Sequence, residues 1–160
     1  LISCAEPQTV LEEGESATVE DARLITGSAL WTLLYVEDNQ ANMQLVERIV
    51  ARRSDIRLLT AVSGPLGIEI ARSAQPTVIL MDINLPGMSG VEALRFLRED
   101  PATAHIPVVA LSANAMPHDI ARALDLGFFR YLTKPLVIRE FTDALDAALE
   151  FTNADSRRRQ

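Results

Sequence analysis

From Trp31 onward, short apolar runs alternate with longer stretches in which apolar residues recur at helical spacing. This alternation is typical of βα units arranged around a parallel sheet. The pattern predicts strands at residues 32–36, 57–61, 77–81, 108–111 and 129–132. It predicts helices at residues 41–53, 65–74, 90–99, 118–126 and from 137 to about 150. Five such repeats indicate a doubly wound α/β fold, with right-handed crossovers that place helices on both faces of the sheet.

The same pattern predicts which segments are buried. The strands predicted at residues 77–81 and 108–111 are apolar on both faces, as expected of the central strands of a parallel sheet. The last helix repeats Val137, Phe141, Leu145 and Ala148 on one stripe. This stripe is expected to face the core, because a helix at the surface of a domain turns its apolar side inward.

The two ends of the chain differ from this regular part. Residues 1–30 hold six acids against one arginine and show little periodicity, so we expect an acidic linker or the end of a preceding domain. Residues 31–151 are expected to form one domain. Residues 152–160 hold one acid and three arginines, which is typical of a solvated C-terminal tail. The chain does not begin with methionine, so it is expected to derive from a longer or processed protein.

The overall composition argues against several classes of protein. The net charge of −7 disfavours nonspecific nucleic-acid binding, which requires a basic surface. No apolar run approaches the ~20 residues that a membrane-spanning helix needs. The single cysteine, Cys4, cannot form an internal disulfide and fits a reducing compartment. We therefore expect a cytoplasmic domain that contacts neither nucleic acid nor membrane directly.

Polar side chains follow four of the five predicted strands. Glu37 and Asp38 follow the first strand, Asp82 the third, Ser112 the fourth and Lys134 the fifth. Each residue alone has an ordinary explanation as a helix cap, a turn residue, a surface hydroxyl or a solvated lysine. Because ligands of such folds bind at the carboxyl ends of the strands, the five side chains are expected to converge on one functional edge of the sheet.

This set of side chains suits a metal ion and a phosphoryl group. Three carboxylates that lie close together repel one another unless a cation joins them. Oxygen ligands without a nearby histidine or cysteine favour Mg²⁺. Lys134 is the only lysine among fifteen basic residues, and together with Ser112 it is expected to contact phosphoryl oxygens. Asp82 is the best candidate for the nucleophile.

Asn84 separates two kinds of chemistry. An aspartate at this position would supply the general acid and base of an aspartyl-phosphate hydrolase, which the amide of Asn84 cannot do. The residues therefore favour a stored acyl phosphate on Asp82 over catalytic turnover. An interaction module that works without phosphorylation is a further alternative, and the complete set of polar residues argues against it.

Residues 31–151 resemble the receiver domains of two-component signalling. The resemblance rests on Glu37-Asp38, Asp82, Leu85-Pro86-Gly87-Met88-Ser89-Gly90, Ala110-Leu111-Ser112-Ala113, Tyr131 and Lys134-Pro135. It implies the flavodoxin-like fold with strand order 2-1-3-4-5. It also implies that Asp82 is the phosphoacceptor, and that a histidine kinase or a histidine phosphotransfer domain supplies the phosphoryl group. The implied Mg²⁺ site has Asp38 as a direct ligand and Glu37 acting mostly through water, with Asp82 and the backbone carbonyl of Asn84 beside them.

The resemblance further implies a switch. Ser112 matches the hydroxyl that swings toward the phosphoryl group, and Tyr131 matches the aromatic residue that changes rotamer on activation. Lys134 matches the invariant lysine of the family, which usually forms a cis bond to the next proline. Asn84 and Asn114 occupy positions that tune the lifetime of the phosphate. By this resemblance the chain supports its own phosphorylation and dephosphorylation and is not an enzyme that acts on a separate substrate.

The parent protein and its assembly are predicted less directly. The run at residues 110–116 and the acidic residues 1–30 favour the receiver of a hybrid sensor histidine kinase. A free-standing single-domain response regulator is the alternative. A weak homodimer formed through the last two βα units is compatible with the family resemblance. The stimulus and the output are not encoded in these residues.

Overall fold

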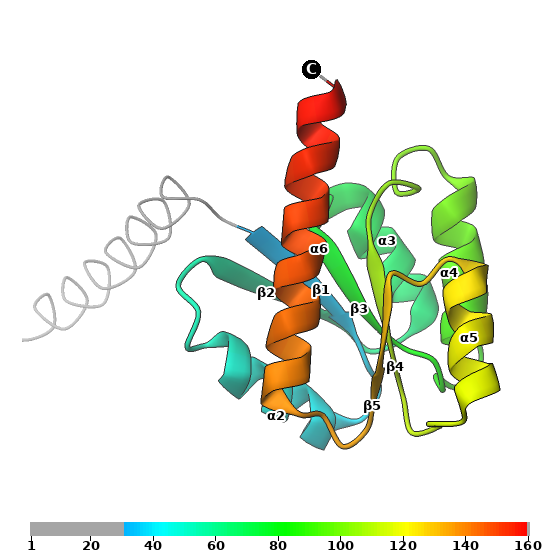
Figure 1. Cartoon of the computed structure of the whole chain (residues 1–160). Coiled ribbons are helices and arrows are strands. Elements are labelled where there is room, and N and C mark those ends of the chain that lie inside the picture. Colours follow the sequence, from blue (N-terminus) through cyan, green and yellow to red (C-terminus); the bar gives the residue numbers. More distant parts are fainter. Residues whose placement is uncertain (1–30, 160) are drawn as a thin grey trace, which may run out of the picture. The chain divides into compact units, whose positions relative to one another are not determined.

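The computed structural model describes residues 31–159, in which five strands and five helices alternate along the chain (Figure 1). The strands are β1 (Trp31–Val36), β2 (Ile56–Ala61), β3 (Val78–Asp82), β4 (Val108–Ser112) and β5 (Arg130–Thr133). The helices are α2 (Gln40–Val50), α3 (Gly64–Ala74), α4 (Gly90–Glu99), α5 (Pro117–Leu126) and α6 (Ile138–Arg159). Their boundaries agree with the predicted ones within one residue, except at the ends of α2 and α6. The acidic linker expected at residues 1–30 lies outside the described residues.

The strands form one parallel sheet in the order β2-β1-β3-β4-β5, which confirms the predicted order 2-1-3-4-5. In its register, Val36 of β1 lies beside Met81 of β3, and Asp82 lies beside Leu111 of β4. Ser112 in turn lies beside Thr133 of β5. The residues that end β1, β3, β4 and β5 therefore meet at one edge of the sheet.

Two hydrophobic clusters cover the two faces of the sheet. One joins the sheet to α3, α4 and α5, and the other joins it to α2 and α6. Figure 1 shows these two groups of helices on the two faces of the sheet. All five residues of β3 and all five of β4 are buried, which confirms that they are central strands. Because both faces are covered, the polar groups that end these strands are reached mainly from the sheet edge.

Three of the helices begin with a side-chain cap. The side chain of Asn39 caps α2 by accepting a hydrogen bond from the backbone amide of Asn42. Ser63 caps α3, and Ser89 forms a reciprocal capping box with Glu92 at the start of α4. A cap of this kind satisfies amide groups that the first helical turn leaves free. The caps of α2 and α4 therefore set where the chain turns away after β1 and after the loop that follows β3.

The C-terminal helix differs most from its prediction. α6 continues to Arg159, so the tail predicted to be a solvated terminus is helical. Beyond the expected end, the ring of Phe151 lies 5.3 Å from that of Phe129, and the Thr152 hydroxyl donates to the carbonyl of Thr77 at 3.3 Å. These contacts join residues far apart in the sequence and stabilise the added turns. None of the helices in residues 31–159 is both long and apolar enough to cross a bilayer.

Two smaller predictions are also wrong. Val137 precedes α6 and is 50% exposed, so the inward stripe consists of Phe141, Leu145 and Ala148. α2 ends at Val50 and not at residue 53, because the chain turns there. The amide of Arg53 donates to the carbonyl of Val50 at 2.8 Å, and the Arg53 guanidinium pairs with Asp55 at 2.9 Å. A polar pair two residues apart thus replaces the last helical turn.

Candidate functional site

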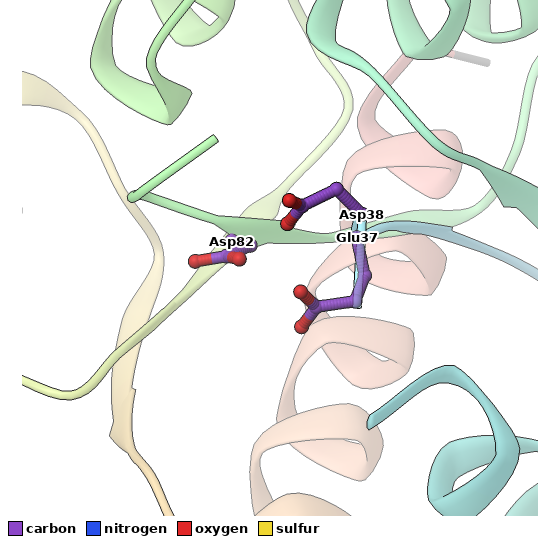
Figure 2. Close-up of side chains that lie close together, drawn as sticks. All are labelled: Glu37, Asp38 and Asp82. Atoms are coloured by element: carbon purple, nitrogen blue, oxygen red, sulfur yellow. The ribbon is translucent and has the colours of Figure 1, made fainter. Parts of the chain in front are cut away.

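Three carboxylates lie close together at the edge of the sheet. Glu37 and Asp38 directly follow β1, and Asp82 is the last residue of β3. One oxygen of each carboxylate lies within 4.8 Å of an oxygen of the other two, and Figure 2 shows the three side chains around a common gap. Glu37 and Asp82 are buried, whereas Asp38 is exposed. The predicted convergence of the acidic residues is confirmed.

The ammonium group of Lys134 bridges two of these carboxylates. Its Nζ atom lies 3.3 Å from Oε1 of Glu37 and 3.3 Å from Oδ2 of Asp82. The Lys134 amide donates to the Ser112 carbonyl at 2.9 Å, which anchors the loop after β5 beside β4. The Lys134–Pro135 bond is cis, as the resemblance implied. Lys134 is therefore part of the site and not a solvated lysine.

Ser112 and Asn84 complete the polar edge. The backbone amide of Asn84 donates to Oδ1 of Asp82 at 3.0 Å, and the side-chain amide of Asn84 donates to the Ser112 hydroxyl at 3.5 Å. The Ser112 hydroxyl also accepts a 3.1 Å hydrogen bond from the backbone amide of Asn114. Both oxygens of Asp82 thus have a partner, Asn84 for one and Lys134 for the other. The side chains from β3, β4 and β5 form one connected network.

Tyr131 is joined to this network indirectly. Its hydroxyl donates a 2.6 Å hydrogen bond to the backbone carbonyl of Asn114, the residue whose amide reaches Ser112. The Asn114 side chain accepts from the amide of Met116 at 2.9 Å and donates to Asp119 at 2.7 Å. The loop between β4 and α5 is therefore held from three sides, and Tyr131 holds it from β5.

Two residues of the site were not predicted from the sequence. Tyr35 is fully buried in β1 and donates a 2.7 Å hydrogen bond to Oε1 of Glu37. The pKa of Tyr35 is raised far above its ordinary value, mainly by burial and to a smaller extent by the contact with Glu37. Alternate residues of a strand share a face, so a tyrosine two positions before Glu37 was a usable signal.

Gly90 was also missed. A Cβ atom at this position would lie 2.5 Å from the carbonyl oxygen of Asp82 and 2.7 Å from the Cα atom of Ile83. The amide of Gly90 donates to the carbonyl of Ile83 at 2.9 Å. The start of α4 therefore packs against the backbone that carries Asp82, and only glycine fits there without a shift. From the sequence alone, Gly90 is the last residue of the loop motif and the first residue of a predicted helix, and no contact with Asp82 follows from either.

The donor set fits a hard divalent cation. In residues 31–159, the one group of metal-ligating side chains close enough to share an ion is Glu37, Asp38 and Asp82. All of its donor atoms are carboxylate oxygens, the ligands that Mg²⁺ prefers. Three carboxylates beside the single ammonium of Lys134 leave an excess of negative charge, which a divalent ion would offset. The residues present are thus suited to Mg²⁺ with open positions for water or phosphoryl oxygens.

Comparison with known proteins agrees with this geometry. The response regulator receiver domain family matches residues 33–146. The polar-differentiation response regulator DivK of Brucella ovis is 35% identical over 118 residues, which cover 74% of this chain and 95% of DivK.

Solved structures are similar over the same region. The receiver domain of sensor histidine kinase PA1611 from Pseudomonas aeruginosa PAO1, which has a magnesium ion coordinated in its active site cleft, matches with a TM-score of 0.69 and 30% identity. The match covers 76% of this chain and 99% of that domain. Chemotaxis protein CheY4 of Vibrio cholerae matches with a TM-score of 0.69 over 76% of this chain and 100% of CheY4; at 24% identity this likeness shows the fold alone. With the family match and the identity to DivK, the chain belongs to the response regulator receiver domain family, the phosphoacceptor modules of two-component signalling.

Proposed function

We propose that Asp82 is the residue of this receiver domain that accepts the phosphoryl group. The observation that carries the proposal is the position of its carboxylate. Asp82 is 2% exposed, ends the central strand of the sheet, contacts the Lys134 ammonium and lies beside the two other acids. Asp38 is exposed, and Glu37 is engaged by several hydrogen-bond donors, so neither is placed as well for attack.

The transfer exchanges one bond for another. An oxygen of the Asp82 carboxylate forms a bond to the phosphorus of a phosphohistidine, and the phosphorus–nitrogen bond breaks with its electron pair remaining on the histidine. Lys134 then turns from the carboxylates to a phosphoryl oxygen, and the Ser112 hydroxyl donates to another. The side-chain amide of Asn84 can donate a hydrogen bond to the phosphoryl group but cannot act as a general acid. The acyl phosphate on Asp82 therefore persists long enough to signal.

Glu37, Asp38, Asp82 and the backbone carbonyl of Asn84 would hold Mg²⁺ in this scheme. When bound, Mg²⁺ would neutralise part of the charge shared by the carboxylates and the phosphoryl oxygens. The all-oxygen donor set supports this assignment. Asp38, the exposed member, lies where a ligand that enters from solvent arrives first.

The signal would leave the site through Ser112 and Tyr131. Once the Ser112 hydroxyl turns toward the phosphoryl group, its hydrogen bond from the Asn114 amide is lost, and the loop that holds Tyr131 is free to rearrange. The contact between Tyr131 and Asn114 supports this route. The surface at α5, β5 and α6 would change with it and so alter partner binding.

The partner that we propose as phosphoryl donor is a histidine kinase or a histidine phosphotransfer domain of the cytoplasm.

For the parent protein we propose a hybrid sensor histidine kinase, and the likeness to the receiver domain of a sensor histidine kinase supports it. The similar likeness to DivK keeps a free-standing regulator as the alternative. A weak homodimer through α5, β5 and α6 fits either arrangement. The molecular mass of the native protein, detected in cell extract with a specific antibody, distinguishes a hybrid sensor histidine kinase from a free-standing regulator.

One experiment tests the phosphoacceptor. The protein is incubated with Mg²⁺ and acetyl phosphate, and its intact mass is measured over time. We expect a Mg²⁺-dependent adduct of one phosphoryl group in the wild type, none in Asp82→Asn, and a normal adduct in the control Asp125→Asn, which changes an exposed acid at the end of α5. No adduct in the wild type would favour an interaction module. Rapid, continuing consumption of acetyl phosphate with little adduct would favour a hydrolase.

A further inference from the structure

Tyr35 places a hydroxyl group inside an otherwise apolar cluster. It is 0% exposed and packs with β-strand and helix residues of the face covered by α2 and α6. A buried hydroxyl group without a hydrogen-bond partner destabilises the folded state, so Tyr35 needs an acceptor within the core. Among the described residues, its hydrogen-bond partner is Oε1 of Glu37, at 2.7 Å. This polar contact therefore links the core directly to the acidic site.

The two oxygens of Glu37 have unequal surroundings. Oε1 faces three donors: the Tyr35 hydroxyl at 2.7 Å, Lys134 at 3.3 Å and the Asn42 side chain at 3.4 Å. In the described part of the chain, Oε2 accepts one hydrogen bond, from the amide of Asn39 at 3.2 Å. Since a carboxylate oxygen accepts about two hydrogen bonds, Oε2 keeps capacity for another donor. The short bond to Tyr35 sets which oxygen faces the core and which remains available.

Of the three donors on Oε1, Tyr35 is the most firmly held. Lys134 is shared with Asp82 and its side chain is 23% exposed, and Asn42 makes the longest contact. Under the proposed function, Lys134 leaves Glu37 for a phosphoryl oxygen. Tyr35 would then keep Glu37 partnered and oriented, whereas a phenylalanine would leave Oε1 with only the long 3.4 Å contact from the Asn42 side chain among the donors named above.

We propose that Tyr35 is a positioning residue for the metal site, which acts by holding the Glu37 carboxylate with Oε2 available to a water molecule on the bound cation. The inference rests on the proposed function, because it takes Mg²⁺ as the ion at this site. Groups that orient the ligands of a metal typically change its affinity by about 10- to 100-fold when they are removed. Tyr35 would thus tune how much Mg²⁺ the domain needs, while leaving the phosphoacceptor itself untouched.

The test measures Mg²⁺ affinity directly. MgCl₂ is titrated into the full chain, and the amide resonances of residues 37–39 and 82–84 are followed by NMR. Tyr35→Phe is expected to weaken binding about tenfold. Thr103→Val is the matched control, since it removes a buried hydroxyl that donates to the Leu97 carbonyl at 2.7 Å, away from the site. It should lower stability and leave Mg²⁺ affinity unchanged. Urea unfolding of each variant verifies that it is folded.

A double-mutant cycle tests whether Tyr35 acts through Glu37. In a Glu37→Gln background, Tyr35→Phe should change Mg²⁺ affinity by less than about twofold, because the carboxylate that it orients is gone. A similar loss in both backgrounds would overturn the proposed route. Unchanged affinity in Tyr35→Phe would overturn the inference altogether.

Phosphorylation by acetyl phosphate provides a second readout. In Tyr35→Phe, the Mg²⁺ concentration for half-maximal phosphorylation should rise about tenfold, with an unchanged yield at saturation. Failure of the wild type to bind Mg²⁺ or to form an adduct would instead count against the proposed function. A wild type that does both, with a variant that behaves identically, would refute the role of Tyr35 alone.

Discussion

The hydroxyl of Tyr131 donates a hydrogen bond to the backbone carbonyl of Asn114 at 2.6 Å, and so ties β5 to the loop that follows β4. The amide of the same Asn114 donates to the Ser112 hydroxyl at 3.1 Å. A single loop residue therefore contacts both of the residues expected to switch. A displacement of Ser112 has a short physical path to Tyr131.

We expect beryllofluoride with Mg²⁺, a stable mimic of the phosphoryl group, to shift the amide resonances of residues 113–126 in the wild type. Tyr131→Phe removes the donor to Asn114, so the shifts in residues 113–126 should shrink, while those next to Asp82 remain. Two-dimensional NMR of both proteins checks this. Equal responses of residues 113–126 in the two proteins would exclude Tyr131 from the switch. No response in the wild type would argue against a switch on this face.

Asp82→Asn should stabilise the metal-free protein by about 1 kcal/mol, because it removes one of three adjacent carboxylates and keeps the shape of the side chain. Added Mg²⁺ should raise the free energy of unfolding of the wild type by binding only the folded state, and should do so far less in the variant. Urea unfolding with EDTA or with MgCl₂ measures both effects. Asp125→Asn, which neutralises an exposed acid elsewhere, should follow the wild type. A destabilised Asp82→Asn would mean that the bond to Lys134 outweighs the repulsion.

Gly90→Ala should destabilise the protein by about 1–3 kcal/mol, the usual cost of overpacking, and slow its phosphorylation. The new Cβ atom would press on the backbone of Asp82 and Ile83, which cannot move without displacing the acceptor. Gly64→Ala is the matched control, since its Cβ atom would meet the flexible side chain of Met88 at 3.0 Å. Urea unfolding and intact-mass phosphorylation measure the two effects. If the two variants behave alike, the close approach at Gly90 is not what positions Asp82.

Arg98→Met should lower the free energy of unfolding by about 2–3 kcal/mol, because carbonyl groups lose their charged donor. The Arg98 guanidinium donates to the carbonyls of Ala104, Ile106 and Gly127 at 3.2, 2.8 and 3.3 Å. It thereby joins α4 to the segments that enter β4 and β5, at the edge of the sheet opposite Asp82. The yield of phosphorylation should therefore be unchanged while the protein remains folded.

Arg95→Met is the control for that prediction, since Arg95 lies on the exposed side of the same helix. Its free energy of unfolding should stay within about 0.5 kcal/mol of the wild type. Equal unfolding midpoints for the two arginine variants in urea would show that the three carbonyl contacts add nothing to stability.

Much of the site could be predicted because its residues follow strands. A buried strand of a parallel sheet is recognisable from its apolar run, and the edge where such strands end is common to all of them. Glu37, Asp82 and Ser112 could therefore be placed together before any contact was known. Gly90 could not, because its role depends on how closely α4 approaches the backbone after β3.

The order of the elements, the class of the sheet and the residues at its functional edge follow from the amino-acid pattern, because alternating patterns and strand ends are local features. The partners of those residues follow only from the way the chain packs in three dimensions. The Tyr35 hydroxyl on Glu37 and the Lys134 ammonium between Glu37 and Asp82 each depend on side-chain orientation. The extension of α6 to Arg159 likewise depends on Phe151 packing on Phe129. Contacts between distant residues arise from packing in three dimensions, which no local periodicity contains.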